Sequence, residues 1–219
     1  MTTATCTPTS LLATTDPEPP PPGQDLRDAA LQLRLLLGLG TSLAIATVLC
    51  AQGAAIRRTE TVLAVSASGQ TIGFSPAGPL DGAIRKLAAE ALLTGQERLE
   101  RLEIDAEAAS YIGLTGGVAL DVHAASVHAG DPVFSNTLRH LDRGDAAVII
   151  IGTRGVSGYA EVGPAHAAGS LGWAGLPTPV IDDARSMLGT RQTAWRTYGP
   201  RGERGLTGTQ VWMQSFPRV

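Results

Sequence analysis

The chain has 219 residues, which is enough for one large domain or two small ones with real hydrophobic cores. Its formal net charge is −3 and 17% of its residues are charged, which argues against a nucleic-acid-binding protein, because such proteins present a basic face. Aromatic residues make up only 4% of the chain, so the core has to rest on Ala, Val, Leu and Ile.

Residues 1–23 are rich in Thr and Pro and end in four consecutive prolines before Gly23. Such a segment buries little apolar surface and offers few backbone donors, so we predict a disordered or polyproline-like tail. A docking peptide is the other interpretation of a proline run.

Residues 24–37 carry apolar side chains at the spacing of an amphipathic helix. The uncharged stretch 35–56 could be mistaken for a transmembrane helix on hydropathy alone. However, Gly38 and Gly40 interrupt it early, as a helix end does, and residues 42–49 have the β-branched content of a buried strand. We therefore predict helix, turn and strand in a cytoplasmic protein that does not cross a membrane.

The rest of the first half alternates strands and helices. Residues 61–65 and 71–74 flank a turn, which predicts a hairpin, and a helix is predicted from Asp81 to a stop at Gly95. Residues 98–104 alternate charged and apolar side chains, as an exposed edge strand does. A short helical turn at 107–112 and a strand after the glycine turn 113–117 complete this half.

The second half repeats this order of elements in shorter form. We predict a helix end at 138–142, a buried strand at 146–151, a match at 169–172 to the strand at 72–74, a helix at 179–188 and strands at 193–198 and 207–216. The glycine-rich stretch 152–158 lacks the spacing of a nucleotide-binding loop and is interpreted as a mobile loop. The predicted fold is α+β, with two related β-rich units at 24–130 and 131–219, each with one principal amphipathic helix; the alternative is one continuous domain.

No combination of acid, base and nucleophile suggests catalysis, and no metal-binding motif is visible. The two cysteines, Cys6 and Cys50, have neither CxxC partners nor metal spacing, so we predict no disulfide framework and no zinc site. His123 and His128 lie five residues apart without an accompanying ligand cluster and are interpreted as surface histidines. We therefore predict a protein that is not an enzyme and holds no metal.

The glycine turns are better candidates for a binding site, because exposed backbone N–H groups can form an anion-binding nest and Arg grips phosphate in bidentate fashion. The predicted cofactor-binding residues are Arg57, Arg58, Gly73, Gly78, Asp81, Gly113, Thr115 and Gly117. The alternative is that the glycines are ordinary turn residues and that the two arginines lie on a solvated edge. The spacing of these residues in the sequence, taken alone, favours this alternative.

Four segments, 46–48, 53–57, 77–81 and 113–117, together resemble the N-terminal domain of the XdhC/CoxI family, and the likeness extends over 33–127 and more weakly over 146–216. The resemblance implies that the chain has the fold of this N-terminal domain. It also implies that the protein is bacterial and is an accessory protein for the maturation of molybdenum hydroxylases. Family members bind molybdenum cofactor, protect it during sulfuration and deliver it to xanthine-dehydrogenase-like enzymes. The cofactor is therefore the expected transient ligand, and a molybdenum hydroxylase subunit the expected partner.

The chain departs from the family pattern at Ile56, which stands in place of a proline, and at Pro79 and Gly116, each of which stands in place of a cysteine. Thiolates are soft ligands for metals and carriers of sulfur, so thiol chemistry at the two cysteine positions is not expected here. Most members also carry a C-terminal Rossmann domain, for which a chain ending at Val219 has no room. We predict a truncated, divergent family member.

Three functional hypotheses follow. The first is a non-catalytic accessory protein of a molybdenum hydroxylase. The second is a module that binds a pterin or a nucleotide without a role in maturation, and the third is a divergent enzyme. Exposed edge strands also allow a homodimer.

Overall fold

The computed structural model describes residues 26–52, 62–73, 80–111, 115–154 and 158–219. Its first unit contains α1 (Leu26–Gly38), β1 (Leu43–Gln52), β2 (Val62–Ser66), β3 (Thr71–Gly73), α2 (Asp81–Thr94), β4 (Arg98–Ile104), α3 (Ala106–Tyr111) and β5 (Val118–Val127). The five strands form sheet A in the order β3-β2-β1-β5-β4, and every neighbouring pair is antiparallel.

The second unit repeats this topology. It contains α4 (Pro132–Asp142), β6 (Ala147–Arg154), β7 (Tyr159–Val162), β8 (Ala167–Gly169), α5 (Thr178–Met187), β9 (Thr193–Tyr198) and β10 (Thr209–Phe216). Sheet B has the order β8-β7-β6-β10-β9, again antiparallel throughout. The identical strand order confirms the predicted α+β fold with two related β-rich units.

A pair of glycines fixes which residues correspond between the units. Gly73 ends β3 and Gly169 ends β8, both at positive φ, and a Cβ on either would overlap the carbonyl oxygen of the adjacent strand, at Val62 and Tyr159 respectively. Only glycine tolerates this combination of dihedral and close approach. Tyr159 therefore corresponds to Val62, and the positions that follow correspond in turn.

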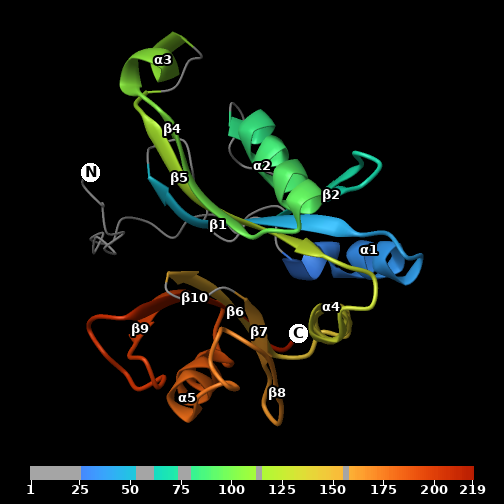
Figure 1. Cartoon of the computed structure of the whole chain (residues 1–219), viewed down its shortest axis with the longest axis vertical. Helices are drawn as coiled ribbons and strands as arrows, with labels where there is room; N and C mark the ends of the chain where they lie inside the picture. Colours follow the sequence, from blue (N-terminus) through green and yellow to red (C-terminus); the bar gives the residue numbers. More distant parts are fainter. Residues whose placement is uncertain (1–25, 53–61, 74–79, 112–114, 155–157) are drawn as a thin grey trace.

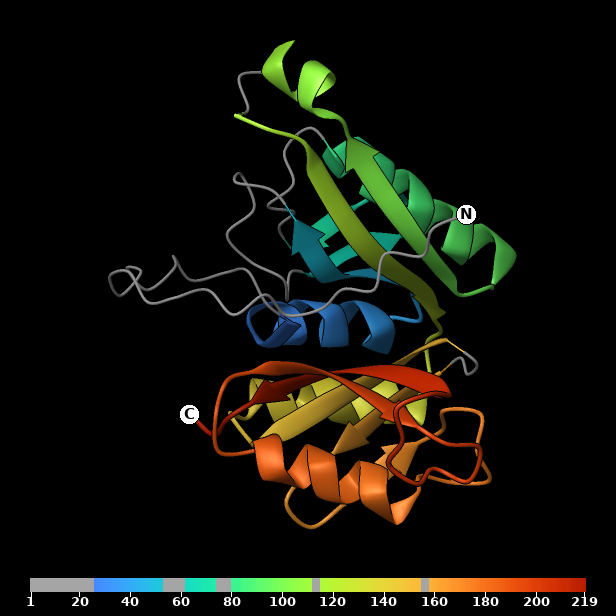
Figure 2. The same ribbon diagram turned by 90° about the vertical axis from the view of Figure 1, so that its left-hand side faces the viewer.

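The molecule is layered (Figures 1 and 2). Helix α2 covers the outer face of sheet A, α5 covers the outer face of sheet B, and α1 and α4 lie between the two sheets. The alternation of strand side chains explains this arrangement. In β1, Ala44, Ala46 and Val48 pack toward α2, whereas Leu43 and Ile45 face the layer of α1 and α4.

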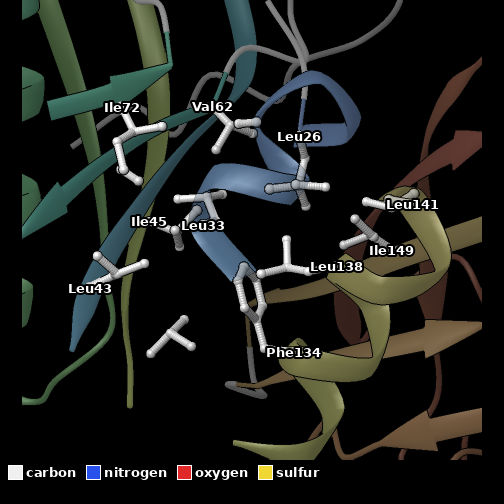
Figure 3. Packing of buried hydrophobic residues seen from close by; sticks show 14 of the residues in the cluster. Leu26, Leu33, Leu43, Ile45, Val62, Ile72, Phe134, Leu138, Leu141 and Ile149 are labelled. Carbon is white, nitrogen blue, oxygen red and sulfur yellow. The ribbon is translucent and has the colours of Figure 1, made fainter. Parts of the chain in front are cut away.

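The two units share their central core. Leu33 of α1, Leu138 of α4 and Ile149 of β6 belong to one buried cluster, together with Trp212 and Phe216 of β10 (Figure 3). The helix pair is also joined by an ion pair between Arg34 and Asp142, at 3.0 Å. The guanidinium of Arg27 donates to the carbonyls of Pro217 and Asp145 at 2.5 and 2.6 Å and lies over the Phe216 ring. Neither unit has a complete core without the other.

Most predicted elements are confirmed within the described residues. The helix and strand predicted across residues 24–49 are α1 and β1, and no helix of the described residues is long and apolar enough to cross a membrane. Gly95 ends α2 in the left-handed conformation, as its position predicted. The alternating segment 98–104 is β4, at the edge of sheet A.

Three sequence predictions were wrong. The stretch 152–154 is not a loop but the end of β6, where Gly152 pairs with Val211. His123 is not a surface histidine, since it is only 6% exposed. Cys50 is buried in β1 and disulfide-bonded, so the prediction of no disulfide framework, made from the absence of a CxxC pattern, missed this bond.

Candidate functional site

A cavity of about 340 Å³ lies between the two sheets, beside the helices that separate them. Sheet A contributes residues of β1, β2 and β5 to its wall, and sheet B contributes residues of β6, β7 and β10. The volume is within the range of small-molecule sites, which are mostly apolar with a few placed polar groups. The lining follows this pattern, with Ile45, Phe134, Ile149 and Trp212 among its apolar members.

His123 brings a polar group to the wall on sheet A. It lies on the inner face of β5 because Leu120, Val122 and Ala124, on the other face, pack toward α2. Its Nε2 is buried, lies 3.6 Å from Oε2 of Glu97, and makes no hydrogen bond in the described part of the chain. A buried ring nitrogen whose one charged neighbour is too distant for a hydrogen bond is incompletely satisfied, which marks it as a candidate contact for a ligand.

Glu97 connects the two units at the rim of the cavity. It follows α2 in the first unit, and its Oε2 accepts a hydrogen bond of 3.1 Å from the backbone N–H of Gly158 in the second. The neighbouring His123 imidazole holds the pKa of Glu97 below its ordinary value, and the Gly158 N–H acts in the same direction against the effect of burial. The carboxyl group is therefore ionised at neutral pH.

Tyr159 supplies a second buried polar group from sheet B. Its ring packs on Phe134 of α4 with centroids 5.3 Å apart, and burial raises the pKa of its hydroxyl. The hydroxyl oxygen makes no well-aligned hydrogen bond among the described residues, although the side chain of Thr137 lies close enough to oppose the rise of its pKa. Asp131 stands nearby at the start of α4, where Oδ1 accepts the N–H of Phe134 as a helix cap.

The cavity offers aromatic rings, two carboxylates and two polar atoms that lack a well-aligned hydrogen bond in the described part of the chain. Among the described residues that line it there is no Lys, Arg or Cys. A flat neutral heterocycle with N–H donors fits this set of groups, because carboxylates accept such donors and aromatic faces stack on the ring. A phosphate group does not fit it, because no described lining residue supplies a Lys or Arg cation.

Only some of the predicted cofactor-binding residues can be compared with the cavity. Arg57, Arg58, Gly78 and Gly113 are outside the described residues. Gly73, Asp81, Thr115 and Gly117 are described, but none of them lines the cavity. A binding role for this set remains a prediction.

Gly73 and Gly117 are held far apart by the strand register. Gly73 pairs with Leu63, which pairs with Ala46, whereas Ala119, two residues after Gly117, pairs with Gln52. Gln52 lies six positions after Ala46 along β1, which is about 20 Å of strand. These two glycines therefore do not form one anion nest. Asp81 opens α2, and its Oδ1 is buried without a hydrogen-bond partner in the described residues.

Comparison with known proteins finds a family match within the first unit. Residues 36–103 match the model of the XdhC and CoxI family. This chain carries an XdhC/CoxI segment. The segment runs from the end of α1 into β4, so it confirms the resemblance predicted from the sequence, although it stops before the glycine turn at 113–117. No curated protein matches the chain.

A solved structure extends the likeness beyond the XdhC/CoxI segment. The chain is similar in fold to a xanthine dehydrogenase from Bacillus halodurans, with a TM-score of 0.56 and 16% sequence identity. The match covers 85% of this chain and 52% of that one, so the chain spans about half the length of that protein. At this identity the likeness concerns the fold.

Proposed function

We propose that this protein is a non-catalytic accessory protein of a xanthine-dehydrogenase-like molybdenum hydroxylase, and that it holds a pterin ring in the cavity between its sheets. The proposal rests on one observation: part of the cavity wall is formed by the segment that matches the XdhC and CoxI family. Ile45, Thr47 and Val62, with Glu97 at the rim, all lie within the segment that matches the XdhC and CoxI family.

The lining supports a pterin better than a whole molybdenum cofactor. A pterin is flat and aromatic, and the N–H groups of its pyrimidine edge match a carboxylate acceptor such as Glu97 or Asp131. His123 and Tyr159 offer two further polar atoms that need partners. The phosphate and molybdenum ends find neither a cation nor a thiolate in the described lining, so the proposal places only the ring in the cavity.

Ala125 offers a test of the cavity. Its side chain lines the cavity from β5, and we expect Ala125→Leu to fill part of the space and weaken the binding of a soluble pterin, neopterin, by at least about tenfold. Ala119→Leu is the matched control, because Ala119 lies on the same strand and face with similar exposure but outside the lining. Equal affinity of both variants for neopterin would contradict the cavity as the site.

The accessory role needs a separate test. Immobilised protein should retain the molybdenum-hydroxylase subunit from extracts of the cell that makes it, identified by mass spectrometry. Neopterin binding without retention of that subunit would support the second function, a small-molecule-binding module with no part in maturation, which the cavity also favours. Failure of both would leave the fold without the proposed function.

A further inference from the structure

Three potential metal ligands meet on the second unit, away from the cavity. His140 comes from the last turn of α4, Glu161 from β7, and His166 from the turn between β7 and β8. Nδ1 of His140 lies 2.7 Å from Oε1 of Glu161, and Nε2 of His166 lies 3.2 Å from the same oxygen. One potential ligand atom from each of the three residues lies within 4.8 Å of the other two.

Only one oxygen of the Glu161 carboxylate has a hydrogen-bond partner in the described part of the chain, since Oε1 is bonded to Nδ1 of His140. The side chain of Glu161 is 0% exposed, and Oε2 has no hydrogen-bond partner among the described residues. Nε2 of His166 is also buried, and it is not aligned for a hydrogen bond despite its short distance to Glu161. Buried charges in proteins are normally paired or bound to a metal ion.

The repeat shows that the fold itself does not need a carboxylate here. Because Tyr159 corresponds to Val62, Glu161 corresponds to Ala64, which is 1% exposed and packs in the central core. The position of His166 is held by Gln70 in the first unit: Ser66 donates its N–H to the Gln70 carbonyl, as Gly163 does to that of His166. The second unit therefore has ligand-type side chains where the first has a methyl group and an amide.

The backbone at Gly163 leaves room for the imidazole ring of His166. A Cβ on Gly163 would overlap the ring of His166, so glycine is required beside it. The two imidazoles lie with their centroids 4.5 Å apart. The side chains of His140 and His166 are 23% and 37% exposed, so solvent reaches one side of the cluster while Glu161 closes the other.

We propose that His140, Glu161 and His166 bind a divalent transition-metal ion of the zinc class. Two imidazole nitrogens and one carboxylate oxygen are a common three-ligand set for Zn²⁺, with water as a fourth ligand. Tetrahedral zinc with bonds of about 2.0–2.1 Å places its ligand atoms about 3.3 Å apart, so the observed separations need only small adjustments. The ion also gives the orphaned atoms of Glu161 and His166 a partner.

The site does not depend on the proposed function. None of the three ligands lines the cavity. Tyr159, which does, precedes Glu161 by two residues on the same strand, about 7 Å along it. Tyr159 and Glu161 point to the same face of the strand, so the metal would lie beside the cavity, one side-chain position further along β7.

Isothermal titration with ZnCl₂ of the purified full chain, after removal of metal by a chelator, tests the site. We expect one Zn²⁺ per chain and a higher melting temperature in the presence of zinc, because the ion binds only the folded state. His140→Ala, Glu161→Gln and His166→Ala should each raise the Kd for Zn²⁺ by at least about tenfold. His128→Ala, which removes a histidine outside the cluster, should leave the Kd unchanged.

A double variant distinguishes the loss of zinc ligands from unfolding of the chain. Glu161→Ala with His166→Gln installs the residues of the first unit at both positions, so it should keep the wild-type circular dichroism spectrum while losing zinc binding. The proposal is overturned if the wild-type chain binds no Zn²⁺, or if this folded double variant binds it as tightly as the wild type. Cobalt provides a second readout, since wild-type protein with Co²⁺ should show the visible absorption of a tetrahedral centre and the double variant should not.

Discussion

Glu97 is the residue whose charge most directly connects the two units. Its carboxylate contacts His123 in the first unit and the backbone of Gly158 in the second. Because its pKa is lower in the folded chain than in the unfolded chain, the ionised group stabilises the fold above the unfolded pKa. This contribution is lost as the pH falls through the folded pKa.

We therefore expect Glu97→Gln to lower the free energy of unfolding at pH 7 by up to about 1 kcal/mol, a small value because the side chain is about one-third exposed. The difference between wild type and variant should shrink as the pH falls below about 4.5, where the carboxyl group of the unfolded chain becomes protonated. Urea unfolding at several pH values measures it. A difference that grows on acidification would contradict the assigned role.

At the same scale, the sequence could not predict the cavity. Glu97, His123 and Tyr159 lie on three different segments, and only the packing of two sheets brings them near one another. His123 was interpreted as a surface histidine because no ligand cluster accompanies it in the sequence, but the odd-numbered face of β5 that carries it is turned toward the second unit. That face is covered by the second unit.

At the scale of elements, glycine conformation decides how the hairpins close. Gly69 and Gly73 both have positive φ, but only at Gly73 would a Cβ overlap the neighbouring strand. We expect Gly69→Ala to cost about 1 kcal/mol, from the dihedral alone. Gly73→Ala should cost about 3 kcal/mol, because the strand must also move. Thermal unfolding measures both, and equal costs would contradict the close approach of β3 to β2.

Elements with strong terminal signals were predictable from sequence. Gly95 marks the end of α2, and the alternating residues 98–104 mark an edge strand. Strand β7 was missed because Tyr-Ala-Glu-Val is short and holds a buried carboxylate, which no hydropathy pattern anticipates. The first turn of α4 was missed although Asp131 and Pro132 are a usual helix start.

At the scale of the whole molecule, the shared core makes the two units fold together. All three tryptophans, Trp173, Trp195 and Trp212, lie in the second unit, whereas Leu33 belongs to α1 in the first. Leu33 is fully buried, so Leu33→Ala should cost about 3 kcal/mol. The denaturation midpoint followed by tryptophan fluorescence should fall as much as the one followed by far-ultraviolet circular dichroism. Units that fold independently would show a shift in circular dichroism alone.

The space between the two units has the XdhC/CoxI segment in one wall, opposite the second sheet. Trp212 lines that space, so a bound pterin should quench its fluorescence. The most direct measurement is a titration with neopterin of the wild-type chain, Ala125→Leu and Ala119→Leu, followed by tryptophan fluorescence. We predict saturable quenching in the wild type and Ala119→Leu and at least about tenfold weaker binding in Ala125→Leu. No quenching in the wild type, or the same affinity in all three proteins, would contradict the account.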